Sequence, residues 1–269
     1  MVRFAILGPV ELQTADRRYV PRGPKVRKVL ALMLTRLNQV VDIDDVAEEL
    51  WDETPPRAAV TTVRTHVYHL RKMLEHEAGV PSPEGLLVTQ PAGYLLRADP
   101  THLDAVVFAR LTQEGRRLLD DGRAQEAAPL LGQALGMWRG APLANVLPGR
   151  VLSRHVAHLE EMRGRALELR IEADMRLGKH RELVAELRGL VTADPLNEWL
   201  HAQLIEALRR SGRRGEALGA FRDLRKLLDE ELGLEPSVEL QRLHYDILAG
   251  GDRRAPSPLT GLAMKVHAV

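Results

Sequence analysis

The sequence contains no cysteine among its 269 residues. This absence excludes disulfide frameworks, thiolate zinc sites and cysteine nucleophiles, and it is compatible with a reducing cytosol. The sequence also lacks any run of about 18 uncharged apolar residues, the length that a membrane span needs. The first residues, MVRFAILGPVEL, have too short an apolar run for a signal peptide and alternate like a strand. We therefore expect a soluble, cytoplasmic protein with no membrane partner.

Motifs for catalysis and cofactor binding are missing as well. There is no G-x-x-x-x-G-K-[ST] phosphate loop, no Ser/His/Asp pattern and no glycine-rich loop after a buried strand. His155, His158 and Glu161 lie on one side of a predicted helix, but no further ligand is identifiable and such spacing is more typical of a solvated face. The sequence therefore predicts no enzyme, no cofactor and no metal site.

The net charge of +1 does not indicate a nucleic-acid partner, but the distribution of charge is uneven. Residues 1–98 hold 13 Lys+Arg against 12 Asp+Glu, and seven of those acids lie within residues 42–53. Without that acidic run, residues 1–98 hold 13 Lys+Arg against 5 Asp+Glu. Residues 99–269 hold 25 Lys+Arg against 25 Asp+Glu. Local positive charge of this kind allows a DNA-facing surface in a protein that is not basic overall.

One segment, PPRAAVTTVRTHVYHLRKML at residues 55–74, contains cations and no acid. Its two prolines suit the first turn of a helix, where a missing N–H costs little. At 100° per residue, five apolar side chains fall on one arc, and the opposite arc carries hydroxyls, a phenol and cations. A helix that reads the major groove has this pattern, and so does an ordinary amphipathic helix with a positive face. The apolar arc consists of Val60, Val63, Val67, Leu70 and Leu74.

Arginine can bond both acceptors of guanine, and threonine methyls can contact thymine, so the polar arc predicts two classes of contact. The residues expected nearest the base edges are Thr61, Arg64, Thr65 and Tyr68. The residues expected on phosphates are Arg57, Thr62, His69, Arg71 and Lys72, with Lys25, Arg27 and Lys28 from an earlier helix. For the last three, solvated surface charge explains the pattern equally well.

The order of predicted elements gives this segment a context. Strand-like runs in residues 1–21 precede a helix that starts at Gly23-Pro24, and Asp42 is placed to cap a second helix. The basic segment is the third helix, and the runs LLVT and YLLR around residues 90–93 predict a hairpin. This order is that of a winged helix-turn-helix, and the leading sheet narrows it to the type found in response-regulator output domains. In the hairpin, Gln90 and Arg97 are weaker candidates for DNA contact.

From about residue 101 the pattern is helical only. Gly178 and Gly212 lie 34 residues apart and are followed by matching Glu and apolar positions, and a looser unit begins at Gly122. Thirty-four residues is the tetratricopeptide period, and such units stack into an array. Trp138 and Trp199, with Phe221, are expected in its core. The predicted fold is mainly α: a winged helix-turn-helix with a small antiparallel sheet and hairpin wing over residues 1–98, an all-α tetratricopeptide-like domain over residues 99–250, and a flexible tail over residues 251–269.

The chain resembles the Streptomyces antibiotic regulatory protein family, in which an OmpR-type winged helix precedes a bacterial transcriptional activator domain. The resemblance rests on FAILGPVEL, on DVAEELWDETPPRAAVTTVRTHVYHLRKML and LLVTQPAGYLLR, and on ALGMWRGAPL and the two 34-residue units, and it covers roughly residues 2–249. It implies an activator of antibiotic biosynthesis genes that binds direct repeats near the −35 region and recruits RNA polymerase. Arg64 stands where family members often carry Gln, and His66 where an aromatic is common, which leaves the preferred DNA sequence open.

The acidic run would repel DNA and is therefore expected to face away from it. A solvated helix face explains this run, and in related winged helices the loop after the second helix contacts polymerase; here that loop holds Asp52, Glu53 and Thr54. Two function classes remain: a DNA-binding activator that forms a homodimer on direct repeats, and a helical-repeat scaffold or ligand-responsive regulator whose first domain is an interaction module. The groove-facing helix followed by a hairpin favours the first.

Overall fold

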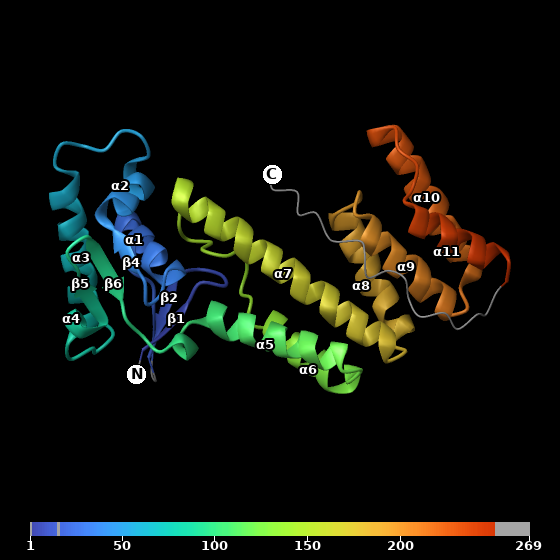
Figure 1. Ribbon diagram of the computed structural model, residues 1–269, viewed down its shortest axis with the longest axis horizontal. Helices are drawn as coiled ribbons and strands as arrows, with labels where there is room; N and C mark the ends of the chain where they lie inside the picture. The colour runs from blue at the N-terminus through green and yellow to red at the C-terminus, as the bar shows by residue number, and fades with distance from the viewer. Residues whose placement is uncertain (1, 15–16, 251–269) are drawn as a thin grey trace. The chain divides into compact units, whose positions relative to one another are not determined.

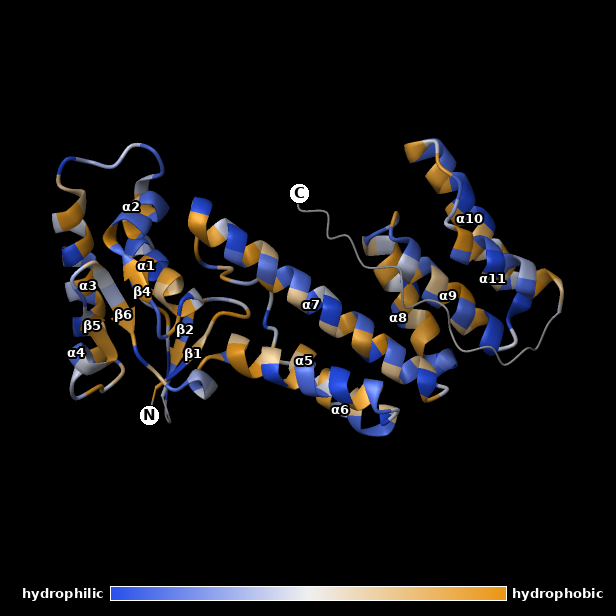
Figure 2. Cartoon of the chain, in the orientation of Figure 1, coloured by the Kyte–Doolittle hydropathy of each residue, from blue (hydrophilic) through white to orange (hydrophobic). Residues whose placement is uncertain are grey.

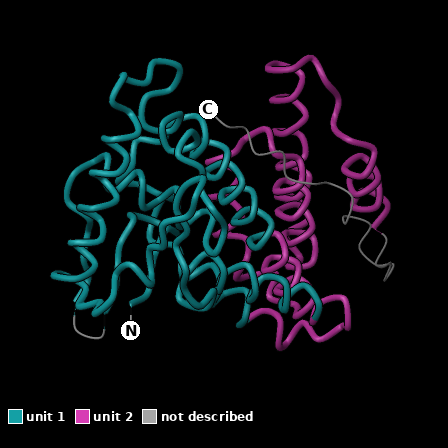
Figure 3. The backbone as a smooth tube through the Cα atoms, turned by 60° about the vertical axis from the view of Figure 1, so that its left-hand side comes forward, with its two compact units in different colours: residues 1–117, 129–167 teal, residues 118–128, 168–269 magenta. Residues whose placement is uncertain are grey.

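The computed structural model describes residues 2–14 and 17–250 of the chain, and in this part the fold is mainly helical, as predicted. None of the described helices has the length and apolar character needed to cross a membrane. The chain divides into two compact units, residues 1–117 with 129–167 and residues 118–128 with 168–269 (Figure 3). This division by packing does not follow the sequence boundary at residue 98. The predicted turn at residues 15–16 and the predicted tail at residues 251–269 lie outside the described residues.

A three-stranded antiparallel sheet opens the first unit, as the alternating pattern predicted. Strands β1 (Arg3–Ala5), β2 (Glu11–Gln13) and β3 (Arg18–Tyr19) pair in the order β1-β2-β3. Phe4 and Leu12 face each other in this register and are both buried. Gly8, between β1 and β2, has φ 148°, and a Cβ there would lie 2.9 Å from the Cβ of Arg139, so only glycine fits.

The winged helix-turn-helix follows. Helix α1 (Pro24–Thr35) starts at the predicted Gly23-Pro24 pair. The sequence did not predict strand β4 (Val40–Asp42), which pairs with β6 (Gly93–Leu96); β6 in turn pairs with β5 (Leu87–Thr89), in the order β4-β6-β5. Three residues are too few for an alternating pattern to be recognised. The wing is therefore held to the helices by a strand, and a Cβ at Gly93 would lie 2.0 Å from the carbonyl oxygen of Val41.

Helices α2 (Ile43–Trp51) and α3 (Ala59–His76) complete the motif, with two corrections to the sequence prediction. Asp42 is the N-cap residue of α2, but its side chain makes no cap hydrogen bond. The two prolines lie in the connection before α3, ahead of a turn at Arg57 and Ala58, instead of in the first turn of the helix. Val60 therefore lies in the first turn, at the edge of the apolar arc, and is 44% exposed, whereas Val63, Val67, Leu70 and Leu74 are buried as predicted. The short helix α4 (Pro83–Leu86) leads into the wing.

The remainder is helical, and the predicted helical hairpins are present (Figure 1). Gly122, Gly178 and Gly212 occupy equivalent turns with φ of 76°, 78° and 78°, a left-handed conformation that favours glycine. Figure 2 shows hydrophobic and hydrophilic residues mixed along these helices, as expected for amphipathic packing. The helices after the short η1 (Pro100–His102) are α5 (Asp104–Asp120), α6 (Ala124–Leu135), α7 (Arg150–Arg176), α8 (His180–Ala193), α9 (Glu198–Arg210), α10 (Arg214–Leu232) and α11 (Val238–Leu248).

Each unit has its own core. In the first, residues from the sheet and α1–α3 share one hydrophobic cluster with residues from α5, such as Phe108, and with the start of α7. The Trp138 ring packs edge-on against Phe108, with centroids 5.3 Å apart. In the second, α9 packs against α8, α10 and α11, and its side chains from Trp199 to Leu208 are all buried. The predicted core positions Trp199 and Phe221 are 7% and 5% exposed.

Candidate nucleic-acid interface

Helix α3 presents the predicted base-reading residues on one exposed face. Its opposite face packs against α1 and α2. The Thr65 hydroxyl donates to the carbonyl of Thr61 at 3.0 Å, which leaves its oxygen able to accept. The structure thus brings together the four residues expected nearest base edges, all of them exposed: Thr61, Arg64, Thr65 and Tyr68.

The cations around α3 differ in what they contact. Among the described residues, the exposed side chains of Arg57 and Arg64 have no hydrogen-bond or ion-pair partner. Lys72 is exposed, and its Nζ donates to Glu75 Oε2 at 2.9 Å; this hydrogen bond raises the pKa of Lys72. Glu75 lies one residue beyond the acid-free segment of residues 55–74, so the composition of that segment did not indicate an acidic partner for Lys72. The free guanidinium on the polar face is therefore that of Arg64.

Arg71 links α3 to the wing. Its Nε and Nη2 donate to the carbonyl of Leu87 at 3.1 and 2.6 Å, and Nη2 also donates to Thr89 Oγ1 at 2.9 Å. The side chain is half-buried by these contacts. The structure thus gives this residue, predicted on a phosphate, a role in fixing the hairpin beside the exposed face of α3.

The three cations of α1 that were predicted on phosphates also differ in their exposure and in their partners. Lys25 is exposed, with its Nζ 5.0 Å from the centroid of the Trp51 ring. Arg27 donates to the carbonyls of Asn145 at 2.7 Å and Pro21 at 3.0 Å. Lys28 donates to the carbonyl of Glu49 at 3.0 Å. Arg27 and Lys28 therefore stabilise the first unit, and Lys25 is the one of the three with an exposed side chain.

The two wing candidates lie at opposite ends of the hairpin. Gln90 is at the tip, where its backbone N–H and C=O bond with those of Gly93 at 2.9 and 3.2 Å. Arg97 follows β6 at the base, next to the Leu87–Leu96 pair, and is exposed. The structure does not bring these two side chains together.

His66, on the flank of α3, has an imidazole whose pKa is lowered from its usual value. Burial lowers the pKa of its imidazole, and the neighbouring Lys25 and His69 lower it further. Its half-buried ring is therefore neutral near pH 7 and does not add to the positive charge of this flank. A groove of about 460 Å³ lies between the start of α1 and the second half of α3, lined by Arg22, Gly23, Val26, His69, Lys72, Met73, His76 and Glu77. Arg22 and His76 were not among the predicted contacts.

The acidic run contains a residue that the sequence analysis misjudged. Glu49 is 1% exposed, so the expectation of a solvated face is wrong at this position. Its carboxylate accepts from the backbone N–H groups of Gly149 at 2.6 Å and Leu152 at 2.8 Å, at the start of α7. Its spacing of three residues from the buried Val46 was the available signal. Glu49 thus caps α7 and fixes it to the winged helix.

The loop after α2 is exposed, as its predicted role requires. Asp52, Glu53 and Thr54 are all solvent-accessible, and Asp52 has φ 52°. Arg150, the first residue of α7, places its guanidinium 3.5 Å from Glu53 Oε1 and 3.7 Å from Glu48 Oε1. Within the described residues no three His, Cys, Asp or Glu side chains gather in a metal-binding group.

Comparison with known proteins gives the family. Residues 17–96 match the family model "Transcriptional regulatory protein, C terminal" and residues 103–248 match "Bacterial transcriptional activator domain". Regulatory protein DnrI of Streptomyces peucetius is 39% identical over 261 residues, covering 95% of this chain and 96% of DnrI. The chain belongs to the Streptomyces antibiotic regulatory protein family. It is therefore a DNA-binding regulator of the activator class.

Other relatives are longer than this chain. Transcriptional regulator RedD of Streptomyces coelicolor is 37% identical, over 92% of this chain and 71% of RedD. Regulatory protein AfsR of Streptomyces griseus is 35% identical over 94% of this chain, which spans 25% of AfsR. The solved structure of Mycobacterium tuberculosis EmbR in complex with a low-affinity phosphopeptide is similar, with a TM-score of 0.87 and 31% identity over 93% of this chain and 65% of that chain.

Proposed function

We propose that this protein activates a secondary-metabolite gene cluster by binding direct repeats near the −35 region of its promoters and recruiting RNA polymerase. The observation that carries the proposal is the exposed face of α3, on which hydroxyls, a phenol and the unpaired Arg64 lie beside a wing anchored by Arg71. An α-helix with such a face fits the major groove, where arginine distinguishes guanine from the other bases. The protein then acts in the cytoplasm, on nucleoid DNA.

The contacts divide by role. Thr61, Arg64, Thr65 and Tyr68 read bases, while Arg57, Lys72 and Lys25 hold phosphates, because their cationic side chains are exposed around the same helix. The phosphate set also takes in Thr62 and His69, and Gln90 at the wing tip contacts the minor groove. Residues 1–98 form the DNA-binding domain and residues 99–250 the activator domain.

Direct repeats call for two protomers arranged head to tail on DNA, because each winged helix reads one half-site in the same orientation. The exposed loop with Asp52, Glu53 and Thr54 faces polymerase, since its acids are unsuited to a phosphate backbone. Activation then combines sequence-specific DNA recognition by α3 with a polymerase contact made by this loop.

A gel-shift titration against salt tests DNA binding directly. Contact with several phosphates releases counterions, so log affinity is expected to fall steeply and linearly with log salt, by about 0.9 per phosphate contacted. Lys72→Ala should lower this slope by about 1 and weaken all sequences alike. A flat salt response, or no preference for a promoter from the neighbouring genes, would instead favour the helical-repeat scaffold.

Charge reversal separates recruitment from DNA binding. The double variant Asp52→Lys with Glu53→Lys is expected to lower transcription by RNA polymerase in vitro while the gel-shift affinity for the promoter is unchanged. Arg22→Ala, which removes a cation from the flank of α3, is the converse control. It should lower the gel-shift affinity for the promoter, which the acidic-loop variant leaves unchanged. Loss of promoter binding in the acidic-loop variant would show that the loop supports α3 rather than polymerase contact.

A further inference from the structure

The second unit contains a groove of about 380 Å³. Helix α9 packs against both α8 and α10 and forms the floor, while those two helices form the walls. We call this space the α8–α10 groove; its lining includes Val191 of α8, Leu204 and Leu208 of α9, and Gly219 and Asp223 of α10. Its volume lies at the lower end of the range for small-molecule sites, which is about 300–1,000 Å³.

Gly219 keeps part of the α10 wall open. It lies in the interior of α10, where glycine is unfavourable relative to alanine. A Cβ at this position would meet nothing within 4 Å, and the φ of Gly219 is not positive, so neither packing nor backbone conformation requires a glycine. The helix therefore gives up stability at a position where a side chain would occupy the groove.

An ion pair joins the two walls at one end of the groove. Arg188 Nη2 of α8 lies 2.6 Å from Glu216 Oε2 of α10, and both residues belong to the lining. Asp223 lies seven residues further along α10, or about 10 Å away at 1.5 Å per residue. A space of this length with one end closed suits a short ligand better than a peptide segment that runs through it.

The opposite end of the groove carries an uncompensated negative charge. Asp223 is exposed, and within the described residues its carboxylate has no hydrogen bond or ion pair. Burial lowers the pKa of the neighbouring His201 imidazole, and the charge of Asp223 opposes this shift only in part. The ring is therefore neutral near pH 7 and does not balance the carboxylate. A cationic group is the partner that this end favours.

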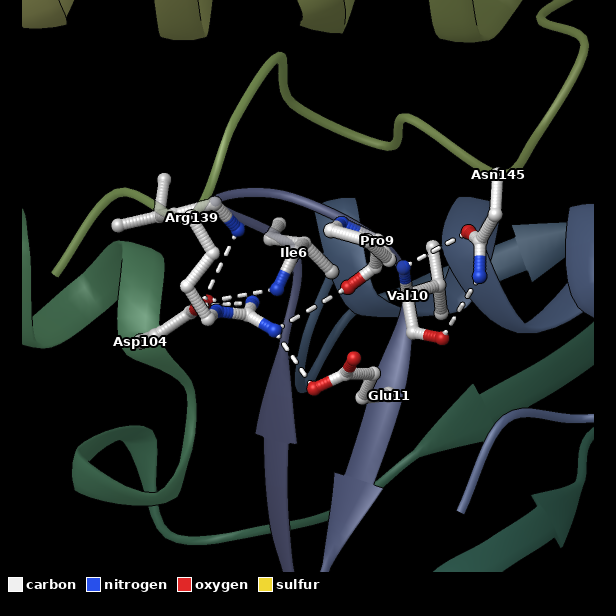
Figure 4. Close-up of polar contacts among 8 residues, drawn as sticks. Ile6, Pro9, Val10, Glu11, Asp104, Arg139 and Asn145 are labelled. Atoms are coloured by element: carbon white, nitrogen blue, oxygen red, sulfur yellow. Dashed lines mark hydrogen bonds and ion pairs between the residues drawn. The ribbon is translucent and has the colours of Figure 1, made fainter. Parts of the chain in front are cut away.

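His201 also has an unused hydrogen-bond acceptor. The residue is 6% exposed, and its Nε2 donates to the carbonyl of Pro195 at 2.9 Å. In this tautomer Nδ1 is an acceptor, and it has no hydrogen-bond partner among the described residues. Polar side chains in protein interiors are usually paired; in the first unit, Asn145 both accepts from and donates to the backbone of Val10 (Figure 4). An open acceptor favours a ligand with N–H groups over a carboxylate.

We propose that the α8–α10 groove binds a small organic amine, whose ammonium group pairs with Asp223 and whose apolar chain lies on Leu204 and Leu208. The proposal depends neither on DNA binding nor on recruitment of polymerase. A ligand held between α8 and α10 binds the folded array and not the unfolded chain, so it stabilises the second unit by mass action. The activator domain is then a receptor for an amine effector.

The test uses hexylamine as the probe and the full-length protein labelled with ¹³C at the methyl groups of valine and leucine. Titration should shift the NMR signals of Val191, Leu204 and Leu208 and should reach saturation. Hexanoate, which has a carbon chain of the same length and the opposite charge, should shift these signals much less. Asp223→Asn should lower the affinity for hexylamine by about fivefold, the effect of losing one exposed ion pair.

Two glycine variants separate the groove from the rest of α10. Gly219→Leu places a side chain in the groove and should abolish the saturable shifts. The matched control is Gly215→Leu, one turn earlier, where a Cβ also meets nothing within 4 Å and the residue does not line the groove. This control should bind hexylamine as the wild type does. Neither substitution should lower the urea midpoint, because leucine favours a helix over glycine.

Three results would overturn the inference. The first is the absence of saturable shifts in the wild type. The second is equal binding of hexylamine and hexanoate, since the groove would then not select a cation. The third is unchanged binding by Gly219→Leu, which would place the amine elsewhere on the protein. None of these results bears on DNA binding, which the gel-shift titration tests separately.

Discussion

The two compact units differ in the kind of contact that stabilises each one internally. In the first, side chains bond to backbone groups far away in sequence: Asp104 accepts from Ile6, Asn145 bonds Val10, and Glu49 accepts from Gly149, across 98, 135 and 100 residues. In the second, contacts recur at short range, such as Arg209 with Glu206 across 3 residues and Arg188 with Glu216 across 28. A repeated unit needs only its neighbours, whereas the first unit depends on contacts between segments that lie far apart in the sequence.

The largest expected effect is on the first unit. Glu49→Gln removes the charge that caps α7 and leaves an N–H of Gly149 or Leu152 facing an amide donor, so we expect the free energy of unfolding to fall by about 3 kcal/mol. Urea denaturation measures the loss, and hydrogen exchange should show reduced protection at the start of α7. The control Glu48→Gln, at the next position but more exposed, should change the midpoint little. Equal effects for the two variants would mean that the cap is not a critical connection.

A smaller effect is expected in the second unit. Gly178→Ala forces a Cβ into a turn with φ 78° and should lower stability by about 1 kcal/mol. The matched control is Gly189→Ala in the middle of α8, where a Cβ meets nothing within 4 Å. This control should raise stability by about 0.5–1 kcal/mol, because alanine favours a helix. Effects of the same sign in thermal melts would contradict the role of the turn glycine.

The smallest effect is expected for an ion pair that joins α8 to α10. Arg188 Nη2 lies 2.6 Å from Glu216 Oε2, but both side chains are about half exposed and Glu216 also pairs with Arg213. Solvent screening leaves such pairs with little net contribution. Arg188→Ala should therefore leave the urea midpoint almost unchanged, even at low salt. A midpoint shift larger than that of Gly178→Ala would show that the array depends on single contacts as the first unit does.

This difference explains what the sequence could predict. The helical hairpins share one local pattern, so the turns at Gly178 and Gly212 could be located from the 34-residue period, and the turn at Gly122 from its looser likeness to them. Strand β4 could not, because three residues carry no recognisable period. The contacts of Glu49 could not be found either, since a bond across 100 residues leaves no local pattern.

The same reasoning applies to the candidate interface. The exposed face of α3 follows from helical periodicity, which correctly separated Val63 and Leu70 from Arg64. Val60 was misplaced because the helix starts after the prolines rather than at them. Arg27 and Arg71 were predicted as free cations, because their acceptors, the carbonyls of Asn145 and Leu87, lie 118 and 16 residues away.

The central claim is that α3 determines the DNA sequence specificity, and Arg64→Ala tests it most directly. The measurement is the ratio of affinities for the footprinted promoter and a scrambled sequence, at one fixed salt concentration, for the wild type, Arg64→Ala and Lys72→Ala. We expect Arg64→Ala to lower this ratio by roughly 1–3 kcal/mol of discrimination, and Lys72→Ala to weaken both affinities while leaving the ratio unchanged. An unchanged ratio for Arg64→Ala, with both affinities lowered equally, would contradict the claim.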